Sequence, residues 1–75
     1  MKIKIPYDIE LCVTPLVNDE LAWGKDHYNL FRRGKVIEGD GDVRYEEGCR
    51  VFDLYILHGR WAGIIWNVKR EWIIK

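Results

Sequence analysis

Residues 2–14 alternate between apolar and polar side chains, and this pattern constrains the fold more than any other feature of the chain. Successive side chains of a strand point to opposite faces, so a period of two predicts a strand with one buried and one solvated face. The apolar members occupy the odd positions Ile3, Ile5, Tyr7, Ile9, Leu11 and Val13. Pro6 lies between them and cannot donate a backbone hydrogen bond, so we expect a bend or an unpaired edge there.

The composition supports a well-packed core. Of the 75 residues, 48% are hydrophobic, and they include four Trp, four Tyr and two Phe. Each aromatic side chain can bury about 150–250 Å², so these residues can dominate a small core. A second core would have too little chain to close over it, and we therefore expect one domain spanning residues 1–75.

Asp40-Gly41 is a dipeptide typical of two-residue hairpin turns, because both central residues of a type I′ turn need a positive φ. A turn centred there places Val36 opposite Tyr45, which is an apolar pair. It also places Lys35 opposite Glu46, which is an ion pair. The sequence thus predicts a hairpin around residues 40–41.

His58-Gly59 predicts a second turn. Pairing outward from it places Ile56 beside Trp61, Leu54 beside Gly63, and Phe52 beside Ile65, so that one face is purely apolar. We expect that face to belong to the core. The other face mixes aromatic, aliphatic and charged side chains and is expected to be half-exposed: Val51, Asp53, Tyr55, Leu57, Arg60, Ala62, Ile64 and Trp66.

The C-terminal stretch also fits a helix, since Trp61, Ile65, Val68 and Trp72 fall at helical spacing. Its four Ile, three Trp and one Val, with Gly63 among them, favour a strand instead. We predict a strand, a turn after Asn67 and a last short strand over 70–74.

The region between the two strand-rich parts is less regular. Thr14-Pro15 resembles a helix start and Gly24 a helix end, which predicts a short helix over about 15–23, with a structured loop as the alternative. Residues 26–34 fit either a helix or a strand. The fold class predicted is mainly β, with β-rich α+β as the variant: a five- to six-stranded antiparallel barrel or roll with a hairpin meander and at most one short helix near residues 15–23.

Twelve basic residues balance twelve acidic ones, whereas a binder of phosphate backbones usually has a basic surplus. The distribution is uneven. From residue 38 to 47 the chain carries five carboxylates and one base, Arg44, whereas bases predominate after residue 48. We expect an acidic patch and a weaker basic one.

The two cysteines lie far from any Cys-x-x-Cys spacing. The N-terminal residues show no long apolar run, so we expect no signal peptide or membrane anchor. Without a secretion signal, Cys12 and Cys49 are expected to be free thiols of a cytoplasmic protein.

Catalytic and metal-binding patterns were sought and none fits. Cys49 and His58 should lie at opposite ends of a strand, and the cysteines and histidines lack the paired spacing of zinc sites. The acidic run from Glu38 has Val43 where a calcium loop needs Gly, and its glycines do not form a phosphate cradle. We expect no catalytic residue, no metal site and no cofactor.

Surplus aromatic residues and the acidic hairpin point to binding. Tyr, Trp and Arg are enriched in interface hot spots. The first hypothesis is a non-catalytic protein-binding module, such as an inhibitor, adaptor or subunit of the kind that phages or mobile elements encode. Its partner would be another protein or a second copy of this chain. The expected contact residues lie on the mixed face and on the acidic hairpin: Tyr55, Trp66, Arg60, Asp53, Asp40, Asp42, Glu46 and Glu47.

The alternative is a small β-barrel that binds single-stranded nucleic acid. Tyr55 and Trp66 would stack on bases, while Arg60, Lys69 and Arg70 would neutralise phosphates. The balanced net charge and the acidic hairpin count against it. An interpretation of the mixed face as ordinary core, covered by the N-terminal strand or the helix, also stays open.

Overall fold

The computed structural model describes residues 1–59 and 61–74 and confirms the expected mainly-β fold. The helical part of these residues is a single 3-10 turn. In chain order the elements are β1 (Lys2–Lys4), β2 (Ile9–Val17), β3 (Glu20–Leu21), β4 (His27–Phe31), β5 (Val36–Glu38), β6 (Asp40–Glu46), β7 (Cys49–Ile56), β8 (Gly63–Val68), the 3-10 turn η1 (Arg70–Trp72) and β9 (Ile73–Ile74).

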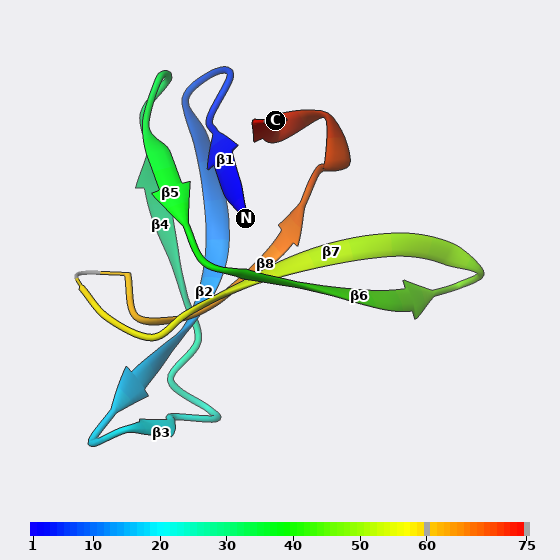
Figure 1. The fold of residues 1–75 in the computed structure, drawn as a ribbon. Helices are drawn as coiled ribbons and strands as arrows, with labels where there is room; N and C mark the ends of the chain where they lie inside the picture. The colour runs from blue at the N-terminus through cyan, green and yellow to red at the C-terminus, as the bar shows by residue number, and fades with distance from the viewer. Residues whose placement is uncertain (60, 75) are drawn as a thin grey trace.

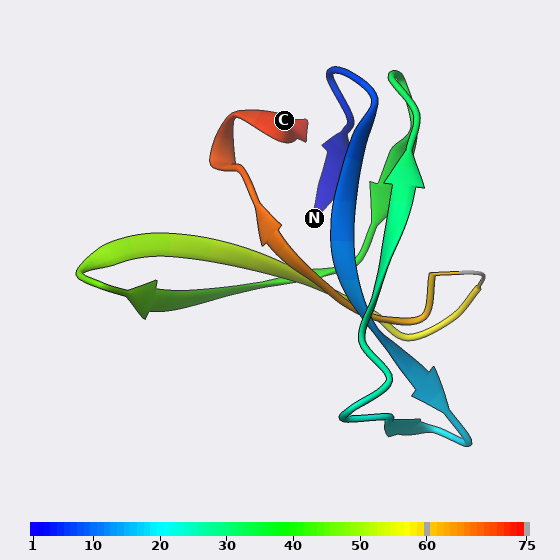
Figure 2. The same cartoon turned by 180° about the vertical axis from the view of Figure 1, so that it is seen from behind.

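The strands form two antiparallel sheets that curl into a half-barrel (Figure 1). The smaller sheet has the order β5-β1-β9. In the larger sheet the order is β3-β2-β8-β7-β6, and β4 also pairs with β2. Only Gly39 separates β5 from β6, so the chain passes directly from the small sheet into the large one. The β6–β7 hairpin projects away from the other strands, as the view from behind also shows (Figure 2).

The N-terminal alternation divides into two strands. β1 and β2 belong to different sheets, and the bend expected at Pro6 separates them. Ile3 and Ile5 are fully buried, which confirms the expected inward direction of the odd positions. Tyr7 is the exception, because it lies in the bend and is 47% exposed. The bend is held partly by Asp8, which accepts hydrogen bonds from the backbone N–H of Arg33 at 2.8 Å and from the Arg32 side chain at 3.1 Å.

The prediction of a hairpin turn at Asp40-Gly41 is wrong. Asp40 begins β6, and the turn lies at Glu47-Gly48, where both residues have a positive φ, 51° and 80°. Val36 therefore pairs with Lys4 in the small sheet, and Tyr45 pairs with Arg50. A Glu-Gly turn replaces Asp-Gly because residues 36–38 complete the small sheet and are not available to pair with β6.

The turn near His58-Gly59 forms with a shifted register. Gly63, and not Trp61, pairs with Ile56, and Ile65 pairs with Leu54. The shift is two residues, and a strand has a period of two, so the sorting of faces is unchanged. Phe52 pairs with Val68 across an irregularity in β7.

The structure also tests the secondary structure predicted for residues 15–23, 26–34 and 61–74. β8 is a strand, as predicted, and no helix forms over 61–72 apart from η1 among the described residues. The predicted strand over 70–74 is reduced to β9. The helix predicted over 15–23 is wrong: β2 runs through Pro15 to Val17, and a turn at Asn18-Asp19, with φ of 50° and 62°, leads into β3. Asn and Asp tolerate such left-handed conformations, and pairing with β3 outweighs the local helix signals. The ambiguous segment 26–34 contains strand β4.

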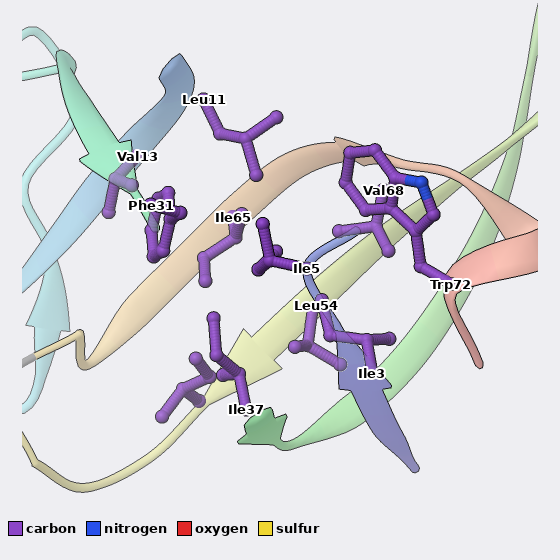
Figure 3. Close-up of a cluster of buried hydrophobic side chains, with 11 residues drawn as sticks. Ile3, Ile5, Leu11, Val13, Phe31, Ile37, Leu54, Ile65, Val68 and Trp72 are labelled. Atoms are coloured by element: carbon purple, nitrogen blue, oxygen red, sulfur yellow. The ribbon is translucent and has the colours of Figure 1, made fainter. Parts of the chain in front are cut away.

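The core lies between the two sheets (Figure 3). It is aliphatic, with one Phe and one Trp, and Phe31 is packed against Trp61 with ring centroids 4.7 Å apart. Its buried members are Ile3, Ile5, Leu11, Val13, Phe31, Ile37, Leu54, Ile56, Ile65, Val68 and Trp72. Trp72 joins the core from η1, and Tyr7 lies edge-on against it at 6.2 Å.

Strands β2 and β8 approach each other closely at Gly63. Its φ of 132° is a conformation that side-chain-bearing residues rarely adopt. A Cβ atom there would overlap the carbonyl oxygen of Thr14 and lie 3.0 Å from the Cα of Pro15. The glycine therefore lets the two central strands pair, and this pairing sets the position of the face described next.

Candidate functional site

The outer face of the large sheet gathers acidic and aromatic side chains. Side chains alternate along β6, so Asp40, Asp42 and Arg44 share one face. The register places Tyr55 opposite Asp40 and Asp53 opposite Asp42. Together with two residues of β8 they line a hollow of about 550 Å³. We call this surface the acidic–aromatic face; it consists of Asp40, Asp42, Arg44, Asp53, Tyr55, Ile64 and Trp66.

The structure brings five of the eight expected contact residues into this hollow: Asp40, Asp42, Asp53, Tyr55 and Trp66. Glu46 lies further along β6 and Glu47 lies in the turn, so both are at the tip of the hairpin. Arg60 lies outside the described residues.

Arg44 organises the face, although the sequence did not point to it as a contact residue. Its Nε donates a hydrogen bond to Asp53 at 2.5 Å, and its Nη1 donates to Glu46 at 2.7 Å. Its Nη2 donates to the side-chain oxygen of Asn67 at 2.7 Å, and the guanidinium lies 5.2 Å from the Trp66 ring. The hydrogen bonds that Arg44 donates to Asp53 and Glu46 raise the pKa of Arg44 above its usual value. Its charge is thus satisfied within the face.

Asp53 has a structural role rather than an exposed one. Only 5% of the residue is accessible, and its carboxylate accepts hydrogen bonds from Arg44 and from the backbone N–H of Asn67 at 3.0 Å. A buried carboxylate is stable only when it is paired in this way. Asp53 fixes Arg44 and the β7–β8 irregularity, and it has little surface to offer a partner.

Asp40 and Asp42 differ from Asp53. Both are exposed, and among the described residues neither forms an ion pair with a cation. Because Arg44 is already engaged by two carboxylates, it does not neutralise them. The open side of the hollow therefore carries negative charge.

The Trp66 indole is held in a fixed orientation. Its Nε1 donates a hydrogen bond to the hydroxyl of Thr14 at 2.8 Å, and that hydroxyl donates to Asp26 at 2.7 Å. Thr14 is fully buried, and Trp23 packs on Trp66 with ring centroids 6.3 Å apart. The hollow thus has a rigid aromatic wall, since a side chain bonded and packed on both sides loses little freedom when it binds a partner.

No protein-family model, curated protein or solved structure matches this chain.

The cations expected to contact phosphates lie elsewhere. Lys69 and Arg70, with Arg50, border a second hollow of about 510 Å³, which also contains Glu46 and Glu71. The two hollows share no lining residue. Two of the expected phosphate contacts, Lys69 and Arg70, therefore do not line the hollow that contains Tyr55 and Trp66, and the third, Arg60, lies outside the described residues.

The groups with catalytic potential are separated. Cys49 begins β7 and His58 lies beyond its end, so at about 3.3 Å per residue the two are roughly 30 Å apart. Both cysteines are free, Cys12 half-buried and Cys49 exposed. Burial raises the pKa of Cys12, and the nearby Asp26 carboxylate raises it further. Residues 1–59 and 61–74 contain no group of three or more His, Cys, Asp or Glu placed to hold a metal ion. In the same residues, no helix has the length and apolar character that a membrane span requires.

Proposed function

We propose that this protein is a small non-catalytic binding module of the cytoplasm, which uses the acidic–aromatic face to hold a basic segment of a partner protein. The observation that carries the proposal is the combination of two unpaired carboxylates, Asp40 and Asp42, with the rigid ring of Trp66 across the same hollow. Such a module acts as an inhibitor, an adaptor or a subunit, according to what its partner does.

The chemistry of the hollow favours a lysine or arginine side chain as its occupant. A guanidinium or ammonium group can pair with Asp40 or Asp42 while its plane or stem packs on Tyr55, beside the wall that Trp66 forms. A hollow with apolar walls and a few charged groups is also the form that anchors of protein interfaces fill. Because the positive charge of Arg44 is paired with Asp53 and Glu46, Arg44 does not repel a cationic occupant strongly.

The surface is large enough for a partner. The protein exposes 5387 Å², so a standard patch of about 800 Å² would occupy roughly one seventh of it. The hollow is lined partly by the projecting β6–β7 hairpin, and the hollow and the hairpin together can supply that area.

Nucleic acid is a poorer candidate for the same surface. Asp40 and Asp42 repel phosphate, and Lys69 and Arg70 border a different hollow. A second copy of the chain is also a poorer candidate, because two identical acidic faces repel each other.

The test starts from a partner recovered by affinity capture and identified by mass spectrometry. Its affinity is then measured by calorimetry for the wild type, for the double variant D40N/D42N and for Y55A. Two exposed charges contribute about 0.2–1 kcal/mol each, so we expect the double variant to bind roughly 2- to 30-fold more weakly.

The matched control is D19N, which removes an exposed carboxylate in the β2–β3 turn, away from the hollow. It should leave the affinity unchanged. The proposal is wrong if D40N/D42N and Y55A bind the captured partner as tightly as D19N does, or if the protein instead binds oligonucleotides with an affinity that falls steeply as salt rises.

A further inference from the structure

Strand β6 is the open edge of the large sheet. The sheet order ends at β6, and within the described residues its only strand partner is β7. It is seven residues long and projects from the body as half of a hairpin (Figures 1 and 2). Natural edge strands are usually protected by charged side chains, especially Lys, by Pro, by a bulge or by short length. The charges of β6 are mostly carboxylates, which oppose another acidic strand but not a basic one. The β6 segment Asp40–Glu46 contains neither Lys nor Pro, and its pairing with β7 is regular along its whole length.

The turn determines which backbone groups of β6 point outward. In a two-residue hairpin turn the flanking residues, here Glu46 and Cys49, form the hydrogen-bonded pair. Hydrogen-bonded and non-hydrogen-bonded pairs then alternate along the ladder. The N–H and C=O groups of every second residue of β6 therefore face away from β7: Gly41, Val43 and Tyr45. Met1 bonds the backbone of Gly39, just before β6, and its side chain lies over Gly41, so an added strand would begin beside Met1.

The side chains of β6 differ between its two faces. One face carries three carboxylates and one base: Asp40, Asp42, Glu46 and Arg44. The other face carries Val43 and Tyr45, which are 38% and 71% exposed. Side chains of an added strand lie beside those of its neighbour and alternate in the same way. A complementary strand therefore has basic residues at one parity and apolar residues at the other.

The same charges disfavour a second copy as the occupant. Two β6 strands paired over their full length across a twofold axis at Val43 would place Asp40 opposite Glu46, and like charges directly opposite destabilise a strand pair. Asp42 would face Arg44, but that guanidinium is already held by Asp53 and Glu46. The charge pattern thus selects a basic strand.

We infer that β6 binds an extended segment of the partner with alternating basic and apolar residues, which adds to the large sheet as a further strand. This inference depends on the proposed function and specifies how the partner is held. The added backbone hydrogen bonds supply affinity, and the carboxylates beside the hollow select the charge and the register of the segment.

The test uses two synthetic peptides of equal composition, KVRVKVR and KRKRVVV, with blocked ends. Binding is measured by fluorescence anisotropy, and amide hydrogen exchange is followed by NMR on the isotope-labelled protein. We expect KVRVKVR to bind at least 10-fold more tightly than KRKRVVV. We also expect it to slow exchange at least 10-fold at the outward amides of Gly41, Val43 and Tyr45.

A variant of the edge separates strand addition from attraction between charges. V43P removes one outward N–H and leaves the hydrogen-bonded pairs with β7 intact, which is where a strand tolerates Pro. It should bind KVRVKVR at least 10-fold more weakly, and the control V43T should bind as the wild type does. If V43P fails to fold, two versions of KVRVKVR replace it, N-methylated at either set of alternate amides. One version should bind and the other should not.

Strand addition is overturned if both N-methylated peptides bind equally, if the three outward amides keep their exchange rates, or if KVRVKVR does not bind. In each of these cases the proposed function still stands when D40N/D42N weakens binding of the captured partner. It fails separately when that double variant has no effect on the captured partner.

Discussion

Replacing Gly63 with Ala tests how the large sheet is assembled. The residue has a φ of 132°, and such a conformation costs a residue with a side chain about 1–3 kcal/mol. The new methyl group would also overlap the carbonyl oxygen of Thr14, which is a backbone atom of β2 and cannot rotate away. Relief requires β2 and β8 to separate.

Separation of the two strands has its own cost. Val13 and Ile65, which pair across this junction, are 2% and 0% exposed, and full burial of such side chains contributes about 1.5–3 kcal/mol each. Losing part of that burial and adding the strain gives at least about 3–5 kcal/mol. A core of this size supplies roughly 3–5 kcal/mol of net stability, so we expect G63A to be largely unfolded at 25 °C.

The control is G34A. Gly34 has a φ of 89°, but a Cβ atom there has no atom within 4 Å, so only the backbone strain of about 1–2 kcal/mol applies. Urea denaturation, followed by tryptophan fluorescence and by far-ultraviolet circular dichroism, measures both variants. The reasoning is refuted if G63A is as stable as G34A within 1 kcal/mol.

Three further predictions concern single groups. T14V removes the buried hydroxyl that bonds Trp66, so we expect a loss of about 1–3 kcal/mol in urea denaturation, and T14S should recover part of it. Cys49 should react with a disulfide reagent at pH 7.5 at least 10-fold faster than Cys12, whose pKa is raised by burial; C49S should leave only the slow phase, and equal rates would contradict this. Hydrogen bonds from its arginine partners lower the pKa of Asp8 in the fold, so its contribution is complete above about pH 5 and disappears as the pH falls through that lowered pKa. D8N should therefore melt below the wild type at pH 7 and together with it near pH 2, and an equal difference at both pH values would show that Asp8 is not the cause.

The direction of side chains could be predicted from the sequence because it is a local property. Alternation in residues 2–14 correctly placed Ile3, Ile5, Leu11 and Val13 inside. The sorting of the β7 and β8 faces is also correct although the register is shifted, since a shift of two residues moves no side chain to the other face. Periodicity therefore identified the sheet and most of the acidic–aromatic face.

The turns could not be predicted in the same way, because they depend on pairing between distant strands. Asp40-Gly41 has a suitable composition for a turn, yet β5 is engaged by β1, and the chain continues past Gly39 into β6. Thr14-Pro15 has the composition of a helix start, yet β8 pairs with β2 as far as Pro15. In both places a long-range strand partner outweighs the local signal.

The hydrogen bonds that hold Trp66 and Arg44 could not be predicted from local sequence patterns either. Thr14 and Trp66 are 52 residues apart in sequence, and Arg44 and Asn67 are 23 apart. The one available signal is that Arg44 is the single base of the acidic run, where several carboxylates are possible partners. Which of them it binds follows from the register of β6 and β7, and that register depends on the turn that was misplaced.

The balanced net charge of the chain does not conflict with an acidic binding surface. Arg44 is the base nearest the hollow, and it is held by Asp53 and Glu46, so it cannot also neutralise Asp40 and Asp42. The other bases of residues 1–59 and 61–74 do not line the hollow. Long-range attraction of a partner is therefore weak, because the total charge is zero. A basic segment must therefore be selected at contact distance, by the exposed carboxylates of Asp40 and Asp42 beside the fixed indole of Trp66.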